Sequence, residues 1–190
     1  MISLDPRTAT IVLIDLHKGI VGMPLGPYSA SAGVNTSTAL AERFRKAGAF
    51  VVLVNIAWAK DLGDTLRQPV DRPSCRPSGG HPEGWSQLVD GLCKPSNILV
   101  TKHRWGAFYG TDLDVQLRRR AIRTIVLGGI ATNISVESTA RQAWQHGYDG
   151  VVAEVATTSI SAEMHAFSIS EILPRISRVT KAGDISLRKD

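Results

Sequence analysis

The chain has 190 residues, which suits one domain with a sizeable hydrophobic core, and we expect a single domain over residues 1–190. Hydrophobic residues make up 43% of the chain and charged residues 21%, as in ordinary soluble globular proteins. No apolar run is long enough to span a membrane, and the first one, residues 9–14, is interrupted at once by polar and charged residues, unlike a signal peptide. We therefore expect a cytoplasmic protein without a membrane partner.

The formal net charge of +5 raises the question of nucleic-acid binding. The positive residues are dispersed, and their one cluster, residues 118–120 with Arg123, lies at the end of a predicted helix. Cations at a helix C-terminus complement the helix dipole and stay solvated. Because no basic stripe is interleaved with aromatic residues, we expect no nucleic-acid partner.

Strand and helix patterns alternate along the chain. The predicted strands cover residues 10–15, 50–56, 97–101, 124–127, 150–154 and 176–180, and the predicted helices cover residues 30–46, 112–120, a stretch after Gly129 to about 146, and 162–173. The strands are continuous apolar runs, which is typical of strands buried on both faces. Repeated strand–helix–strand units predict an α/β fold with a mostly parallel sheet and helices on both faces.

Residues 60–96 interrupt this alternation. They contain most of the prolines, both cysteines and little periodicity. A long irregular segment in a compact domain is more often functional than idle, so we expect it beside the site or at a subunit interface. A merely tolerated insertion is the alternative.

Three polar residues are predicted at the carboxyl ends of three strands. Asp15 ends the first strand, Lys102 follows the third, and Ser135 lies at the start of the helix after the fourth. Parallel strands bring their carboxyl ends to one edge of the sheet, where α/β proteins bind ligands. Each residue alone has an ordinary interpretation, as a cap, a turn residue or a surface cation. Their shared edge favours a functional site.

Three segments in a fixed order span most of the chain: Ile-Val-Leu-Ile-Asp-Leu at 11–16, Lys-His-Arg-Trp-Gly-Ala-Phe at 102–108, and Gly-Gly-Ile-Ala-Thr-Asn-Ile-Ser-Val-Glu-Ser-Thr-Ala-Arg at 128–141. This combination resembles the isochorismatase-like hydrolases, also called the cysteine hydrolase superfamily. The resemblance implies a three-layer αβα, Rossmann-like fold with a six-stranded, mostly parallel sheet. It also implies a homo-oligomer, a dimer or larger.

The resemblance further implies an Asp–Lys–Cys catalytic set at positions 15, 102 and 135, and a cis peptide between Ile130 and Ala131 that turns backbone N–H groups into an oxyanion pocket. Residue 135 is serine here, whereas the amidase members carry cysteine. A serine holds its proton more tightly than a thiol, and a carboxylate is a poor base for it. His103 follows Lys102 and is expected to point to the other face. A Ser135 acyl-enzyme is therefore the less favoured alternative.

The isochorismatases of this family also lack the cysteine, and they hydrolyse a vinyl ether without a covalent intermediate. By resemblance to them, Asp15 is the general acid, Lys102 orients the substrate or stabilises negative charge, and Ser135 leaves room for substrate or water. A nearby ammonium favours the charged carboxylate, so this role for Asp15 requires burial to offset it. The rival to an enzyme is a non-catalytic member that keeps the pocket for binding or assembly.

Substrate contacts and metal binding complete these expectations. We expect a small-molecule substrate and assign contacts with it to Arg104, Trp105, Phe108 and Thr132, with packing or subunit contact as the alternative for the aromatic residues. The metal-binding nicotinamidases carry Asp-x-His after the second strand, where this chain has Asn55-Ile-Ala, so we expect no metal and no cofactor. Where the family usually has Gln, two residues after Asp15, the chain has His17, which we interpret as an ordinary polar loop residue or a substrate contact.

Overall fold

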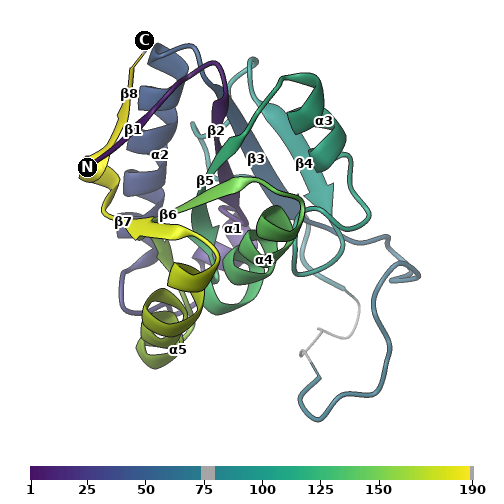
Figure 1. Ribbon diagram of the computed structural model, residues 1–190. Coiled ribbons are helices and arrows are strands. Elements are labelled where there is room, and N and C mark those ends of the chain that lie inside the picture. Colours follow the sequence, from purple (N-terminus) through teal and green to yellow (C-terminus); the bar gives the residue numbers. More distant parts are fainter. Residues whose placement is uncertain (74–79, 189–190) are drawn as a thin grey trace.

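A six-stranded parallel sheet forms the centre of the computed structural model, which describes residues 1–73 and 80–188 (Figure 1). Its strands, in spatial order, are β4 (Ile98–Lys102), β3 (Phe50–Ile56), β2 (Ala9–Ile14), β5 (Thr124–Ile130), β6 (Asp149–Thr158) and β7 (Arg178–Thr180). Each neighbouring pair is parallel. The predicted α/β fold is confirmed, and the sheet is parallel throughout.

Helices cover both faces of this sheet (Figure 1). They are α1 (Lys18–Val21), α2 (Ala30–Lys46), α3 (Leu113–Arg119), α4 (Glu137–Gln145) and α5 (Ala162–Phe167). On one face α2 packs Leu40 and Phe44 against the apolar side chains of β2 and β3. On the other face α3 and α4 pack Leu117 and Ala143 against the alternate side chains of the same strands. The central strands are therefore buried on both faces, as their continuous apolar sequences predicted.

Two strands are longer than predicted, and glycine explains one of them. We predicted that the fourth strand ends at Leu127, before the glycine pair, but β5 continues to Ile130. Gly129 adopts a φ of 124°, and a Cβ there would lie 2.0 Å from the carbonyl oxygen of Ile14 on β2. Glycine thus permits a close approach of two strands instead of a turn. The strand β6 likewise continues to Thr158, past the predicted end at residue 154.

The helix predicted over residues 162–173 is divided in the structure. After α5 the chain forms a π-type turn, η2 (Ser168–Ile172), and a 3-10 turn, η3 (Leu173–Arg175), and β7 starts at Arg178. A second 3-10 turn, η4 (Ala182–Asp184), follows β7. The spacing of apolar residues in the sequence does not distinguish these short turns from α5, so we predicted one continuous helix.

A second, two-stranded parallel sheet was not predicted. It pairs β1 (Ile2–Leu4) with β8 (Ile185–Leu187), so the first and last strands of the chain lie side by side (Figure 1). Each strand has only three residues, which is too short for a period-2 pattern to stand out.

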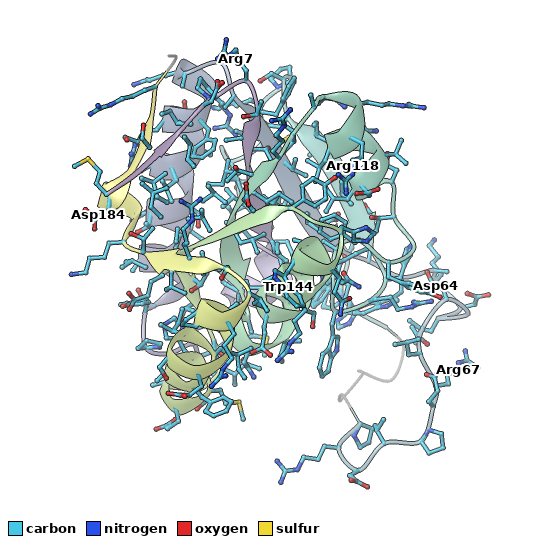
Figure 2. All side chains as sticks on the ribbon, viewed as in Figure 1. Arg7, Asp64, Arg67, Arg118, Trp144 and Asp184 are labelled. Atoms are coloured by element: carbon cyan, nitrogen blue, oxygen red, sulfur yellow. The ribbon has the colours of Figure 1, made fainter. Side chains whose placement is uncertain are left out.

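The irregular segment between β3 and β4 leaves the body of the fold and returns to it (Figure 1). Figure 2 shows Arg67 far out on this segment and Asp64 closer to the body. On the return path residue Leu88 forms an antiparallel bridge with His17. Of the two cysteines in this segment, Cys75 lies outside the described residues and Cys93 is exposed. Among the helices described, none has the length and apolar character that a membrane crossing needs.

The α2 face of the core generates a stability prediction. Phe44 belongs to α2 and is fully buried in the core, whereas Phe167 on α5 is 59% exposed. Phe44→Ala is expected to lower the free energy of unfolding by about 3–5 kcal/mol, because it removes a buried ring and leaves a cavity. The matched change Phe167→Ala should cost less than about 0.5 kcal/mol. Urea denaturation followed by circular dichroism measures both, and equal losses would contradict this description of the core.

Candidate active site

The three predicted residues meet at the carboxyl edge of the sheet. Asp15 follows β2 directly, and its backbone N–H donates to the carbonyl oxygen of Val54 on β3, at 2.8 Å. Its φ of 56° lies in the left-handed region, which is sparsely populated by residues other than glycine. Lys102 is the last residue of β4. Ser135 lies in a π-type turn, η1 (Thr132–Val136), between β5 and α4.

The side chains of these residues contact one another directly. The Lys102 ammonium lies 2.8 Å from Asp15 Oδ2, and the Ser135 hydroxyl donates to the same oxygen at 2.7 Å. Lys102 Nζ also donates to Ser135 Oγ at 3.4 Å and to the carbonyl oxygen of Arg104 at 3.1 Å. Lys102 is completely buried, and Asp15 and Ser135 are 3% and 6% exposed. The predicted convergence of the three groups is therefore present.

The two oxygens of Asp15 differ in their surroundings. Oδ2 accepts from both Lys102 and Ser135, whereas Oδ1 is buried and has no hydrogen-bond partner among the described residues. A buried carboxylate oxygen without a partner is costly, so such oxygens usually face a ligand or water. Asp15 thus has one oxygen that contacts both Lys102 and Ser135 and one whose hydrogen-bonding capacity is unused among the described residues.

The turn after β5 has an unusual backbone. The peptide bond between Ile130 and Ala131 is cis, which is the bond indicated by the family resemblance. The carbonyl oxygen of Ala131 then accepts from the N–H groups of Ile134 and Val136. Single π-type turns of this kind are frequent at functional sites. The turn places Ser135 beneath the end of β5, facing Asp15.

The residues predicted to contact a substrate are dispersed. Arg104 and Trp105 line a cavity of about 390 Å³, together with Leu66, Gly106, Tyr109, Ser138 and Gln142. Phe108 is buried in the core beside α4, with its ring 5.0 Å from that of His146, so it packs as in the alternative interpretation. Thr132 is also buried, and its hydroxyl pairs with Nδ1 of His165 at 2.8 Å.

A larger cavity of about 1030 Å³ lies beside the edge strand β4 and its neighbour β3, against residues 80–88. The rings of Trp58, His81 and Trp85 form a stack along it, with centroids 5.4 Å and 3.8 Å apart. The ring of Trp85 also meets that of His17 edge-on at 4.6 Å. Part of the irregular segment therefore lies beside the site, which is one of the two positions that we predicted for it.

His17 is the site residue that the sequence analysis undervalued. It is completely buried, Nδ1 lies 2.8 Å from the carbonyl oxygen of Trp85, and Nε2 has no partner among the described residues. Desolvation holds the pKa of His17 below its ordinary value of 6.5, against the opposing effect of the Asp15 carboxylate. The signal in the sequence was its place two residues after Asp15. His103, in contrast, contacts the Ala57 carbonyl oxygen and Asp64.

Metal binding has no visible basis in the part of the chain that the structure describes. Within residues 1–73 and 80–188 no three His, Cys, Asp or Glu side chains are placed to hold an ion. The absence of a metal and of a cofactor stays a prediction.

Comparisons with known proteins identify relatives over nearly the whole chain. Residues 9–184 match the family model of the isochorismatase domain. The chain is 48% identical to the uncharacterized isochorismatase family protein YecD of Escherichia coli O157:H7, over 97% of this chain and 98% of the relative. It is 32% identical to the ureidoacrylate amidohydrolase RutB of Methylorubrum extorquens, over 82% of this chain and 72% of the relative. The structure of an isochorismatase family protein from Burkholderia thailandensis superimposes with a TM-score of 0.90 at 42% identity, covering 96% of this chain and 95% of that one.

The buried ion pair predicts that removing one of its charges costs more stability than removing both. Lys102→Met is expected to lower the free energy of unfolding by about 3–5 kcal/mol, because Asp15 is left as an unpaired buried charge. The double change Asp15→Asn with Lys102→Met should cost less than Lys102→Met alone, since no charge then remains. As a control, Arg141→Met breaks the exposed pair with Glu137 and should cost less than about 1 kcal/mol. Urea denaturation measures each, and a double variant less stable than Lys102→Met would contradict the pairing.

Proposed function

Because the chain belongs to the isochorismatase family, whose members include hydrolases, we propose that it hydrolyses a small molecule without a cysteine nucleophile. Asp15 is the acid–base group of this reaction, and the bond broken is a vinyl ether or a related bond. The family resemblance equates Ser135 with the position at which the amidases carry their thiol.

One observation carries the assignment of Asp15: its Oδ1 is buried and unpartnered while Oδ2 is held by two donors. A proton carried by Oδ1 is within reach of a substrate bound at the sheet edge. Transfer of this proton to the enol carbon of a vinyl ether produces an oxocarbenium ion, and addition of water to that ion completes the hydrolysis. A positioned carboxylic acid of this kind contributes about 10²- to 10⁴-fold to a rate.

Lys102 and Ser135 have supporting roles in this scheme. The Lys102 ammonium stabilises the carboxylate that remains after proton transfer, because it lies 2.8 Å from Oδ2. The Ser135 hydroxyl donates to the same oxygen and fixes the orientation of the carboxyl group. The cavity lined by Arg104 and Trp105 accommodates part of the substrate.

A second candidate is an amidase in which Ser135 is the nucleophile. The observation in its favour is the hydrogen bond of 2.7 Å from Ser135 Oγ to Asp15, which is the distance expected between a nucleophile and its base. The ureidoacrylate amidohydrolase among the relatives points to the same chemistry. Against it, a carboxylate is a weak base for a serine hydroxyl, and no histidine contacts Ser135 among the described residues. A non-catalytic binding or assembly member is the third alternative.

We also propose that the chain forms a homo-oligomer, a dimer or larger. The edge strand β4 carries Leu99, which is 60% exposed, and the projecting segment carries Leu66 and Val70, which are 49% and 62% exposed. Natural proteins rarely leave apolar side chains on a sheet edge uncovered, so this edge favours a partner copy.

Substitution separates the two chemical schemes. Asp15→Asn is expected to abolish turnover, because it removes the proton donor, whereas Ser135→Ala or Ser135→Gly should keep much of it. Isochorismate, simple amides and carbamoyl compounds form the panel, and mass spectrometry should detect no acyl-enzyme with any compound that is turned over. An inactive Ser135→Ala variant combined with new amidase activity in Ser135→Cys would instead establish the nucleophilic scheme. Failure of the wild-type protein to hydrolyse any compound would favour the non-catalytic alternative.

Solution scattering and sedimentation test the assembly. We expect a dimer or larger for the wild-type protein and a shift to smaller species for Leu99→Lys, which places a charge on the β4 edge. The control Phe167→Lys changes an exposed ring on α5 and should leave the assembly intact. A monodisperse wild-type monomer would contradict the proposal.

A further inference from the structure

His17 has one ring nitrogen fixed and the other unused. The carbonyl oxygen of Trp85 accepts from the backbone N–H of Gly19 at 2.9 Å and lies 2.8 Å from His17 Nδ1. A carbonyl oxygen only accepts, so Nδ1 must carry the hydrogen. In the neutral ring Nε2 is then an acceptor, and this acceptor is buried without a partner among the described residues.

The ring is also held firmly in this position. It meets Trp85 edge-on, and the Trp85 ring packs directly on the backbone of Gly19, where a Cβ would lie 2.0 Å from Trp85 Nε1. The backbone of His17 is bridged to Leu88 on the same returning segment. Because Gly19 has no side chain, the indole can pack on its backbone and against His17.

His17 follows Asp15 by two residues, and the charged groups around the predicted site act on its ring. Burial has the largest effect on the pKa of His17 and lowers it. The Asp15 carboxylate and the hydrogen bond to the Trp85 carbonyl oxygen raise this pKa, and Lys102 and His81 lower it. The pKa therefore stays below its ordinary value of 6.5, and the ring is neutral at neutral pH. A neutral imidazole with one nitrogen anchored and the other open is arranged as a general base.

We propose that His17 is a catalytic residue whose Nε2 holds the water consumed in hydrolysis and takes a proton from it. This inference rests on the proposed hydrolysis by Asp15. As water adds to the oxocarbenium carbon, a C–O bond forms and one water proton moves to Nε2. The imidazolium then returns that proton to Asp15, which had given one to the substrate carbon, so the enzyme is restored. The hemiketal breaks down to a ketone and an alcohol without a net change in protons.

Kinetics test this role in the wild-type protein and two variants, on any panel compound that is turned over. His17→Gln is expected to lower kcat by about 10²- to 10⁴-fold with KM little changed, because glutamine accepts a hydrogen bond but takes no proton. The wild-type rate should fall as pH drops through the lowered pKa of His17, since burial favours the neutral base, and this limb should be absent in His17→Gln. His146→Gln, at a ring stacked on Phe108, should behave as wild type. A wild-type kcat in His17→Gln, or a loss confined to KM, would overturn the proposal.

A second measurement needs no turnover. Nitrogen-15 NMR of the histidine rings should show His17 as the neutral tautomer with hydrogen on Nδ1 at neutral pH. An Nε2–H tautomer or an imidazolium would overturn the proposal. Because this readout is independent of activity, a wild-type protein that hydrolyses no panel compound defeats the proposed function, while the tautomer of His17 still decides whether Nε2 is an acceptor.

Discussion

The buried ion pair between Asp15 and Lys102 is the interaction on which the site depends. Taking a carboxylate and an ammonium out of water costs several kcal/mol for each ion, and the pair recovers this only where the geometry is close and further hydrogen bonds are made. Here the two charged atoms are 2.8 Å apart, Ser135 donates to the same carboxylate oxygen, and the Arg104 carbonyl oxygen accepts from the ammonium. This arrangement leaves Oδ1 without a partner among the described residues, and the proposed mechanism uses this oxygen.

The fold supplies this geometry through the sheet. β3 separates β2 from β4, so the Asp15 and Lys102 side chains reach across one strand to meet at the carboxyl edge. β5 lies on the other side of β2, close enough at Gly129 to exclude any side chain, and its end carries the turn that presents Ser135. The returning segment then covers this edge, where its Trp85 ring packs against the ring of His17. Elements far apart in the sequence thus build one buried environment, in which electrostatic interactions are strong.

Much of the central sheet was predictable from the sequence because its strands are continuous apolar runs between glycines and helix patterns. The bounds of α2 and β3 agree with the prediction, and the meeting of Asp15, Lys102 and Ser135 followed from their places after strands. The β1–β8 pair and the π-type turns escaped because they depend on tertiary contacts or very short segments. The surroundings of His17 escaped for the same reason: its partner, Trp85, is 68 residues away in a segment without periodicity.

In the proposed mechanism Asp15 delivers a proton to a carbon atom of the substrate. Hydrolysis of isochorismate in D₂O tests it most directly, with mass spectrometry and NMR of the product. The wild-type protein is expected to form a product with one deuterium on the carbon that was the terminal carbon of the enol ether, and Asp15→Asn is expected to form almost none of this product, because its proton donor is missing. An Asp15→Asn protein that forms the deuterated product at the wild-type rate, or a wild-type protein that hydrolyses amides alone, would contradict this role of Asp15.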